Sequence, residues 1–401
     1  MPWKEKSMSQ KRKTLVEEIN SGEESLSAIC RKYAVSRPTA YKWLHRSKTD
    51  DSFEELSRKP LGSPNQTMKS VENLILDARC AHPYWGGRKL KAFLERQGNT
   101  KIPAASTITR ILHSHDLISR EASLAAMPYK RFERKHPNDL WQCDFKGHFK
   151  MSDGNRCHPL TVTDDHSRYN LCISAKDNER LPDVLSSFLL MFEEYGLPKS
   201  ILCDNGNPWG VRTDIGGYTK FEVIMMDYDI KVIHGRPLHP QTQGKEERFH
   251  GTLKRELLSR VEIFDLPSAQ KEFDAFRKEY NEIRPHYALN YAVPADRYEK
   301  SKREMPENIY EWEYECGVEV KKVQNSYIEF RGNKFFFSEG FKGKNVGLIY
   351  SPKDDILEIV YRNFTVSQIN MKEMCFISKK IKRRKKEEIL WNEPRGAHSK
   401  W

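Results

Sequence analysis

Hydrophobic positions near the start of the chain recur at helical spacing. Over residues 14 to 46 they predict helices with breaks near Gly22 and at "VS", inside a module that we place at residues 10–50. The last two helices have the spacing of a helix-turn-helix, with Pro38 in the first turn of the second. Their predicted small core comprises Ala28, Ile29, Tyr33, Val35, Ala40, Trp43 and Leu44.

The second helix of this pair keeps a polar face. It carries Arg37, Thr39, Lys42 and Arg46, as a recognition helix in a DNA major groove would require. The alternative is a helical hairpin that contacts another protein.

A polar, proline-containing linker is predicted at residues 51–67, followed by a second trihelical unit at 68–120. Its third helix presents Thr107 and Arg110 opposite apolar positions. Two tandem modules would lengthen a DNA footprint. Residues 121–137 form a basic connector.

The pattern changes from helical to β at residue 138. "DLWQCDFKGHFKM" predicts one strand, "SDGN" predicts a hairpin turn after it, and two more strands are expected around a turn at Asp165 to Ser167. Helices and short buried strands then alternate up to residue 300. The expected order is β-β-β-α-β-α-β-α, within a multidomain α+β chain.

Beyond Pro294 the pattern is β-rich again, with a hairpin expected around Gly332. Its length and alternation suit a small antiparallel barrel at residues 310–375. The tail at 376–401 contains "KKIKRRKK", seven cations in eight residues, which is typical of a solvated arm that touches phosphate.

The formal net charge of +12 favours a polyanionic partner, nucleic acid before an anionic membrane surface. No apolar stretch approaches a membrane span, and the basic start lacks an apolar signal segment, so a cytoplasmic or nucleoid-associated protein is expected. Its eight scattered cysteines lack zinc-ligand spacing and are expected to be reduced.

Three carboxylates lie where this β/α order can bring them together. Asp144 lies in the first strand, Asp204 ends the fourth, and Glu246 or Glu247 begins the last long helix. Hard divalent cations such as Mg²⁺ or Mn²⁺ prefer carboxylate oxygens, and two such ions can promote phosphodiester displacement. Any one of these acids, taken alone, is more typical of a solvated carboxylate or a helix cap, and only their conjunction favours a metal site.

No nucleophile elbow, phosphate-binding glycine loop or Cys/His pairing accompanies these acids in the sequence. Cations on the same helix could meet DNA phosphates beside the scissile bond: Lys245, Arg248, His250 and Lys254.

Three segments, "WQCDFKGHF", "LCDNGNPWG" and "HPQTQGKEERFHGTLKREL", resemble insertion-sequence DDE transposases with a retroviral-integrase-like core. The resemblance covers about residues 20 to 300 and includes "HPYWGGRKL" and "VTDDHSRY". It implies a ribonuclease-H-like fold, two Mg²⁺ or Mn²⁺ ions in each active site, double-stranded DNA as partner, and at least a homodimer on DNA.

The same resemblance implies that Asp144, Asp204 and Glu247 are the catalytic and metal-binding acids. The family pattern Gln-Gly-x-x-Glu matches Gln243 to Glu247. On a helix with Phe249, Leu253 and Leu257 as its buried stripe, Glu247 points away from the core and Glu246 lies nearer to it. The segment between Asp204 and Glu247 is longer than usual for the family, and Asp164 and Asp165 are expected to be structural.

A transposase that binds the terminal inverted repeats of its element, cleaves there and transfers strands is the expected function. Water would be the first nucleophile and a DNA 3′ hydroxyl the second. The alternatives are a DNA-binding regulator or domesticated transposase without strand transfer, and a nuclease of the same fold that hydrolyses without joining.

Overall fold

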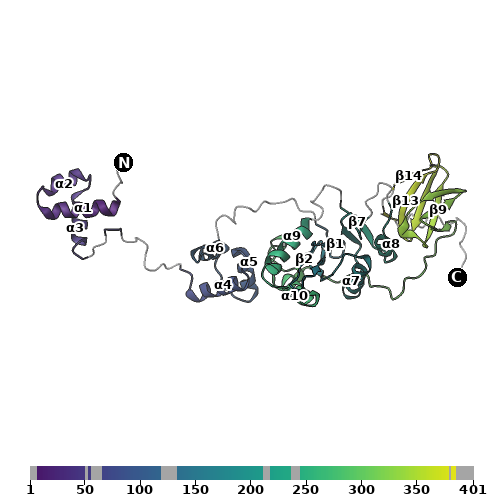
Figure 1. The fold of residues 1–401 in the computed structure, drawn as a ribbon, viewed down its shortest axis with the longest axis horizontal. Coiled ribbons are helices and arrows are strands. Elements are labelled where there is room, and N and C mark those ends of the chain that lie inside the picture. Colours follow the sequence, from purple (N-terminus) through teal and green to yellow (C-terminus); the bar gives the residue numbers. More distant parts are fainter. Residues whose placement is uncertain are drawn as a thin grey trace. The chain divides into compact units, whose positions relative to one another are not determined.

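The computed structural model describes residues 7–49, 53–55, 66–118, 133–210, 217–235, 244–378 and 381–384. The chain divides into two compact units, Met1–Thr67 and Met68–Trp401 (Figure 1). Most of the expected linker (51–67), connector (121–137) and tail (376–401) lie outside the described residues, as does Gln243. Within the described ranges, no helix is long and apolar enough to cross a membrane.

Three helices form the first unit: α1 (Met8–Ser21), α2 (Leu26–Lys32) and α3 (Arg37–Arg46). Each begins after a serine, Ser7, Ser25 or Ser36, whose hydroxyl accepts a backbone N–H of the first turn. Their buried side chains are Leu15, Val16, Ile29, Cys30, Ala40 and Trp43. The pair α2 and α3 has the expected helix-turn-helix order, with Pro38 in the first turn of α3.

A second trihelical module opens the second unit, with α4 (Lys69–Ala81), α5 (Gly87–Arg96) and α6 (Ala105–Ser114). Its core contains Ile75, Trp85, Leu90, Leu94, Ile108 and Leu112. Gly87 allows α5 and α6 to approach closely, because a Cβ there would lie 2.5 Å from the Thr109 hydroxyl and 2.6 Å from the Ala105 carbonyl oxygen.

Polar side chains join this module to the rest of the unit. Glu256 accepts two N–H groups from the buried Arg284, both at 2.8 Å, and the indole N–H of Trp85 at 3.4 Å. Burial alone would raise the pKa of Glu256, but the hydrogen bonds and charge of Arg284 lower it to about 2. Two further contacts link the same parts: His82 with Glu279 at 2.9 Å, and Arg96 with Asp296 at 2.7 and 2.8 Å.

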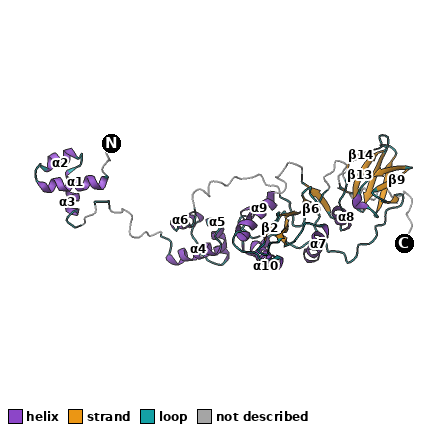
Figure 2. Cartoon of the chain, viewed as in Figure 1, coloured by secondary structure: helices purple, strands orange, loops and turns teal. Residues whose placement is uncertain are grey.

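Five strands form the central sheet: β1 (Trp141–Phe145), β4 (Leu160–Asp164), β5 (Asn170–Ser174), β6 (Ser200–Cys203) and β7 (Lys231–His234). Their order is β5-β4-β1-β6-β7, antiparallel on the β4 side and parallel on the β6 side. Helices α7 (Leu181–Tyr195) and α8 (Lys220–Asp227) connect the parallel strands (Figure 2). This is the expected ribonuclease-H-like order with one added hairpin.

The added hairpin corrects the expected first strand. That strand ends at Phe145, and a separate pair, β2 (Phe149–Lys150) and β3 (Arg156–Cys157), surrounds the turn "SDGN". Gly147 interrupts the run because its φ of +79° is a left-handed conformation that a strand cannot contain.

Two long helical rods complete this part of the unit. α9 (Gly244–Leu253) continues into a π-helical turn, η3 (Lys254–Leu258), and α10 (Leu266–Lys278) into another, η4 (Glu279–Ile283). Short 3₁₀ turns follow at η5 (Tyr287–Leu289) and η6 (Pro294–Asp296). The rods share a core that includes Phe249, Leu253, Leu257, Phe273 and Phe276.

The C-terminal part is an antiparallel β domain. Six strands form one sheet: β8 (Glu319–Lys322), β11 (Asn345–Ser351), β12 (Ile356–Tyr361), β13 (Phe364–Asn370), β14 (Cys375–Ser378) and β15 (Lys382–Arg383). The expected hairpin around Gly332 is present as β9 (Tyr327–Phe330) and β10 (Asn333–Phe336), and η7 (Glu339–Phe341) follows it. Among the described strands, β8 and β14 are the two edges of the main sheet and do not pair with each other, so the expected closed barrel is not confirmed.

Candidate active site

The sheet places Asp144 and Asp204 side by side. In the parallel pair β1 and β6, Trp141 lies opposite Ile201 and Gln142 opposite Leu202. The same register, extended by two residues, brings Asp144 level with Asp204, which directly follows β6. Both acids therefore lie at the carboxyl end of adjacent parallel strands, where sheets of this kind commonly bind ligands.

Negative charge gathers around Asp144. Burial raises the pKa of Asp144 to about 7; the charge of Asp204 is the next cause, and the charges of Glu179 and Glu247 add to it. Glu179 is a fourth acid that the sequence reasoning did not identify, and its carboxylate lies 2.8 Å from His158 Nδ1. The field at this edge of the sheet thus disfavours a further negative charge and favours a cation.

Hydrogen bonds and aromatic packing fix the turn after Asp204. The Gly206 N–H donates to Asp204 Oδ1 at 3.0 Å, and the Asn205 side chain donates to the Gly235 carbonyl at 2.9 Å. Trp209 is buried among aromatic rings, with its ring centroid 5.0 Å from that of Phe221. The turn "DNGNPWG" thus holds Asp204 at the end of β6.

His234, the last residue of β7, contacts this turn from the next strand. Its Nδ1–H donates to the Asp204 carbonyl at 2.8 Å, and Nε2 lies 3.0 Å from Glu222 Oε1. Burial alone would lower the pKa of His234, but the contacts with Glu222 and the Asp204 carbonyl raise it to about 9. The imidazolium therefore donates from both nitrogens at neutral pH.

The two adjacent glutamates of α9 differ in burial. Glu246 is fully buried, whereas Glu247 is exposed. This follows from the helix, because Phe249, Leu253 and Leu257 form the buried stripe and Glu246 lies nearer to it than Glu247 does. Only Glu247 presents its carboxylate to solvent.

Thr161 joins α9 to the sheet. Its hydroxyl oxygen lies 3.0 Å from the Asp144 carbonyl oxygen, 3.1 Å from Glu246 Oε2 and 2.8 Å from His250 Nε2. Burial raises the pKa of Glu246 to about 8, and the charge of Asp144 adds to this. Burial and the charge of Lys146 lower the pKa of His250 to about 4. Both side chains are therefore mainly uncharged at pH 7, and His250 is not the surface cation that the sequence suggested.

Lys245 is also engaged inside the protein. Its ammonium pairs with the buried carboxylate of Asp165 and donates to the Asp165 carbonyl at 3.1 Å. Burial and the charge of Arg168 lower the pKa of Lys245 to about 8. Among the cations predicted to meet phosphate on this helix, Arg248 and Lys254 are exposed.

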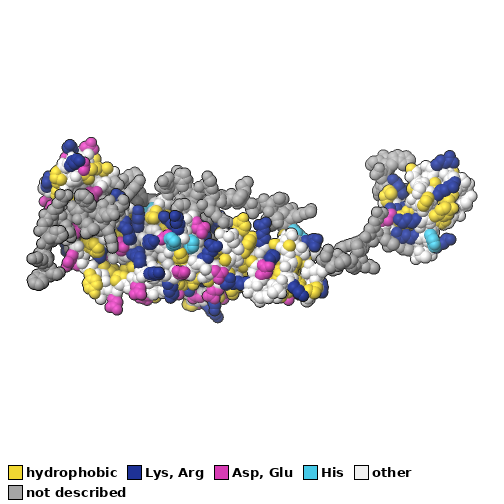
Figure 3. Space-filling model, turned by 180° about the vertical axis from the view of Figure 1, so that it is seen from behind, with side chains coloured by type: hydrophobic (Ala, Val, Ile, Leu, Met, Phe, Trp, Pro, Cys, Tyr) yellow, Lys and Arg dark blue, Asp and Glu magenta, His cyan; other side chains and the backbone are white. Residues whose placement is uncertain are grey.

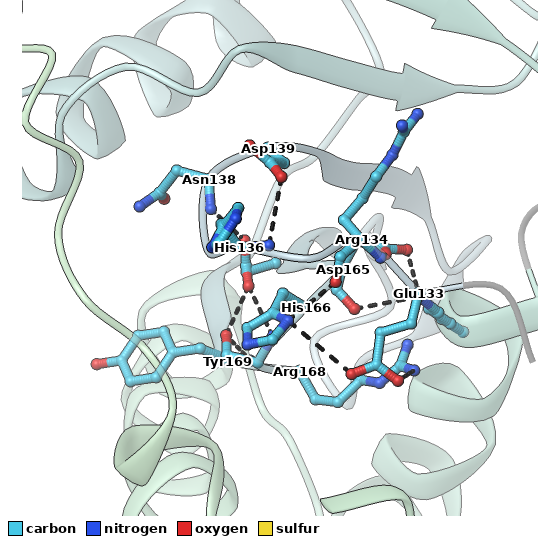
Figure 4. A network of polar contacts seen from close by, with 12 residues as sticks. Glu133, Arg134, His136, Asn138, Asp139, Asp165, His166, Arg168 and Tyr169 are labelled. Atoms are coloured by element: carbon cyan, nitrogen blue, oxygen red, sulfur yellow. Dashed lines mark hydrogen bonds and ion pairs between the residues drawn. The ribbon is translucent and has the colours of Figure 1, made fainter.

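The segment "VTDDHSRY" forms a structural network (Figure 4). Asp164 accepts the backbone N–H of Asn138 and of Ser167, each at 2.8 Å. Asp165 accepts the backbone N–H of Arg134 at 2.7 Å and the Gln142 amide at 2.6 Å. Both carboxylates are occupied by internal donors, in agreement with the structural role expected for them.

Within the described part of the chain, no three His, Cys, Asp or Glu side chains come close enough together to hold a metal ion. The structure brings Asp144 and Asp204 together and places Glu247 within electrostatic reach of Asp144 without completing a three-ligand group.

In the helical modules, the residues predicted to contact DNA lie on α3 and α6. Arg37, Lys42 and Arg110 are exposed, and Thr39, Arg46 and Thr107 are partly exposed. Lys42 and Arg46 lie over the Trp43 ring, at 5.1 and 5.2 Å from its centroid. Figure 3 shows Lys and Arg side chains, with acidic ones between them, on the surfaces of both units.

The sequence reasoning missed Thr161, Glu179, Glu222 and His234. The sequence marks Thr161 only as a polar residue within the apolar strand "LTV", and His234 only as the residue that ends "KVIH". Their partners are distant in the sequence, so spacing alone could not identify them.

Comparisons with known proteins agree with this architecture. Integrase core domain families match residues 134–240 and 228–294, and a homeodomain-like domain matches residues 39–112. The insertion element IS407 uncharacterized 31.7 kDa protein of Burkholderia multivorans is 29% identical over 243 residues, which are 56% of this chain and 81% of that protein. The insertion element IS476 uncharacterized 39.2 kDa protein of Xanthomonas euvesicatoria is 24% identical over 244 residues, 58% of this chain and 65% of that protein.

Among solved structures, the HTLV-2 integrase catalytic core domain in complex with magnesium is 21% identical, with a TM-score of 0.31, and the match covers 41% of this chain and 97% of that chain. The domain matches and the insertion-element relatives agree with the family resemblance of the sequence motifs. The matches therefore support the resemblance to an insertion-sequence transposase with an integrase-like core.

Proposed function

We propose that this chain is a DNA transposase that binds the terminal inverted repeats of its element, cleaves DNA at the ends and joins the 3′ hydroxyls to target DNA. The observation that carries the proposal is the pair Asp144 and Asp204 at adjacent parallel strand ends, with the pKa of Asp144 raised to about 7. Two carboxylates that repel each other at a strand end are suited to bind a divalent cation.

The donor set fits Mg²⁺ or Mn²⁺. Asp144, Asp204 and Glu247 supply hard carboxylate oxygens, and we assign the third position to Glu247 because it is exposed while Glu246 is buried beside Thr161. When bound, two such ions would activate an attacking oxygen and stabilise a leaving oxygen at a phosphodiester.

The chain's own side chains hold the acids and the DNA. The Gly206 N–H and His234 orient Asp204, and Thr161 holds the Asp144 strand against α9. Arg248 and Lys254, exposed on the rod that carries Glu247, are suited to meet phosphates, whereas Lys245 and His250 are engaged internally. No protein nucleophile is needed, since water and then a DNA 3′ hydroxyl would attack.

Recognition of the element ends is assigned to the helical modules. Arg37, Thr39, Lys42 and Arg46 on α3 would enter the major groove of double-stranded DNA, with Thr107 and Arg110 on α6 as a second contact. Two ends must be joined together, so at least a homodimer would act on DNA, in the bacterial cytoplasm at the nucleoid.

One reaction tests this proposal. Full-length protein is mixed with labelled DNA carrying the ends of the encoding element and with Mg²⁺ or Mn²⁺, and nicked and joined products are resolved beside those of Asp204→Asn. We expect metal-dependent nicking and joining by the wild type only. Binding without cleavage would support the regulator instead, and cleavage without joining would support the nuclease.

A further inference from the structure

Helix α8 belongs to two hydrophobic cores. Phe221 and Met225, one helical turn apart, are buried in the core of the central sheet. Val223 and Met226, on the opposite face, are buried in the core of the C-terminal β domain. The helix therefore packs into both cores, and neither the central sheet nor the C-terminal β domain can shift without disturbing the packing of the other.

The C-terminal β domain holds the segment before α8. The Tyr218 backbone N–H donates to the Ser338 hydroxyl at 2.7 Å, and the Tyr218 carbonyl accepts the Gly340 N–H at 3.2 Å. A Cβ at Gly340 would lie 2.3 Å from that carbonyl oxygen, so only glycine permits this approach.

The same domain also holds the last residue of α8. Asp227 accepts the Tyr361 hydroxyl at 2.6 Å, Arg362 Nε at 2.9 Å and Lys344 Nζ at 2.7 Å. The Asp227 side chain is only 4% exposed, so these three donors compensate a buried charge. Both ends of the helix are thus fixed by the C-terminal domain.

Between these anchors, Glu222 faces the candidate active site. Its Oε2 accepts the Thr219 backbone N–H at 2.6 Å and caps the helix, and its Oε1 lies 3.0 Å from His234 Nε2. His234 in turn donates to the Asp204 carbonyl at 2.8 Å. The His234 ring also packs on the turn, because a Cβ added at Gly210 would lie 3.2 Å from it.

We infer that the C-terminal β domain positions Asp204 through a brace made of α8, Glu222 and His234. Glu222 and His234 are positioning residues, since they act on the backbone of Asp204 and not on substrate. The domain thereby has a task in the reaction that does not require it to touch DNA. The inference rests on the proposed function only for its catalytic consequence, because the brace itself can be measured without metal or DNA.

Hydrogen exchange of the full-length protein tests the brace directly. Asp227→Asn and Tyr361→Phe weaken the polar contacts between α8 and the C-terminal β domain and do not alter a residue that contacts Asp204. We expect the amides of residues 203–210 and 234–235 to exchange several-fold faster in both variants, since the turn then opens more often. The matched controls are Asp354→Asn and Tyr327→Phe, the same chemical changes at more exposed positions of the C-terminal β domain, and they should leave this exchange unchanged.

Cleavage kinetics add a readout that general destabilisation would not give. Glu222→Ala should lower kcat by about tenfold and raise the Mg²⁺ concentration needed for half-maximal cleavage, with the KM for DNA unchanged, and Glu222→Gln should recover part of the loss. Thermal midpoints identify any variant that fails to fold. If Asp227→Asn or Glu222→Ala does not fold, the milder Tyr361→Phe variant provides the test of the brace.

The outcomes separate the two claims. Unchanged exchange at residues 203–210 in a folded Asp227→Asn and Tyr361→Phe protein would overturn the brace, whatever the activity. A wild type without metal-dependent cleavage would overturn the proposed function, while the exchange result would still decide the brace.

Discussion

The two sides of the candidate active site are built differently. Asp144 and Asp204 are placed by the backbone, because the β1 and β6 ladder fixes their register. Glu247 is placed by a helix that reaches the sheet through side chains, namely Lys245 with Asp165 and Glu246 with Thr161. The strand acids are therefore aligned by backbone pairing, with the contacts of the turn after Asp204 in addition, whereas the position of Glu247 depends on buried side-chain contacts between α9 and the sheet.

Because of this difference, substitutions that change the charge of an acid can be distinguished from substitutions that change where an acid lies. A change at a strand acid should remove charge and leave the ladder intact. A change in the helix contacts should move Glu247 without removing the charge of any of the three acids. Variants of the strand acids should therefore lose cleavage activity without losing stability, whereas variants of the helix contacts should lose both.

The largest effect is expected on the strand side. Asp204→Asn keeps an oxygen for the Gly206 N–H but removes the charge, so cleavage should fall by about 10³-fold or more while the thermal midpoint changes little. Single-turnover cleavage and thermal melting of the same preparations measure both. Residual cleavage near the wild-type rate would show that Asp204 is not a ligand.

On the helix side, the adjacent glutamates should differ strongly. Glu247→Gln should lower cleavage by about 10²-fold or more, with unchanged stability, because the exposed carboxylate proposed as the third metal ligand loses its charge. Glu246→Gln should lower it by less than about tenfold, since the pKa of Glu246 near 8 leaves it protonated at pH 7, and glutamine resembles the neutral acid. Equal losses in the two variants would remove the distinction between them.

The buried pair that anchors the end of the α9 rod should matter for stability. Arg284→Met leaves Glu256 buried without its bidentate partner and should lower the free energy of unfolding by about 3–5 kcal/mol. Arg96→Met, which breaks the exposed pair with Asp296, should change it by less than about 1 kcal/mol. Urea unfolding of both variants measures the difference, and similar losses would contradict a special role for the buried pair.

A smaller effect is expected from pH in the metal-free protein. The pKa of Asp144 is raised from near 4 when unfolded to about 7 when folded, so its contribution to stability is complete below about pH 4 and is lost as the pH rises through 7. The free energy of unfolding, measured from pH 4 to 8 without divalent cations, should fall less steeply in Asp144→Asn than in the wild type. Identical pH dependence in the two proteins would show that folding does not raise the pKa of Asp144.

Much of the strand side could be predicted from the sequence. Asp144 and Asp204 each follow a short apolar run, "LWQC" and "ILC", and the alternation of elements places those runs in one sheet. The burial of Glu246 and the exposure of Glu247 follow from helical geometry. These features depend on local periodicity, which the sequence carries directly.

The contacts between elements could not be predicted in this way. Thr161 meets Glu246, 85 positions away, and Asp227 meets Tyr361, 134 positions away. Such contacts depend on side-chain packing after the fold has formed. The hairpin turn at "SDGN" was predicted, but the separation of β2–β3 from β1 was missed, because the break at Gly147 was not recognised in an otherwise alternating run.

The central claim is that Asp204 binds the divalent cation used in DNA cleavage. Asp204→Cys tests it most directly, because a thiolate is a poor ligand for Mg²⁺ and a better one for a softer ion such as Mn²⁺. We predict that this variant fails to cleave element-end DNA in Mg²⁺ and regains measurable cleavage in Mn²⁺, while Asp204→Ala stays inactive in both. Equal activity of Asp204→Cys and Asp204→Ala in Mn²⁺, or wild-type activity of either in Mg²⁺, would contradict the account.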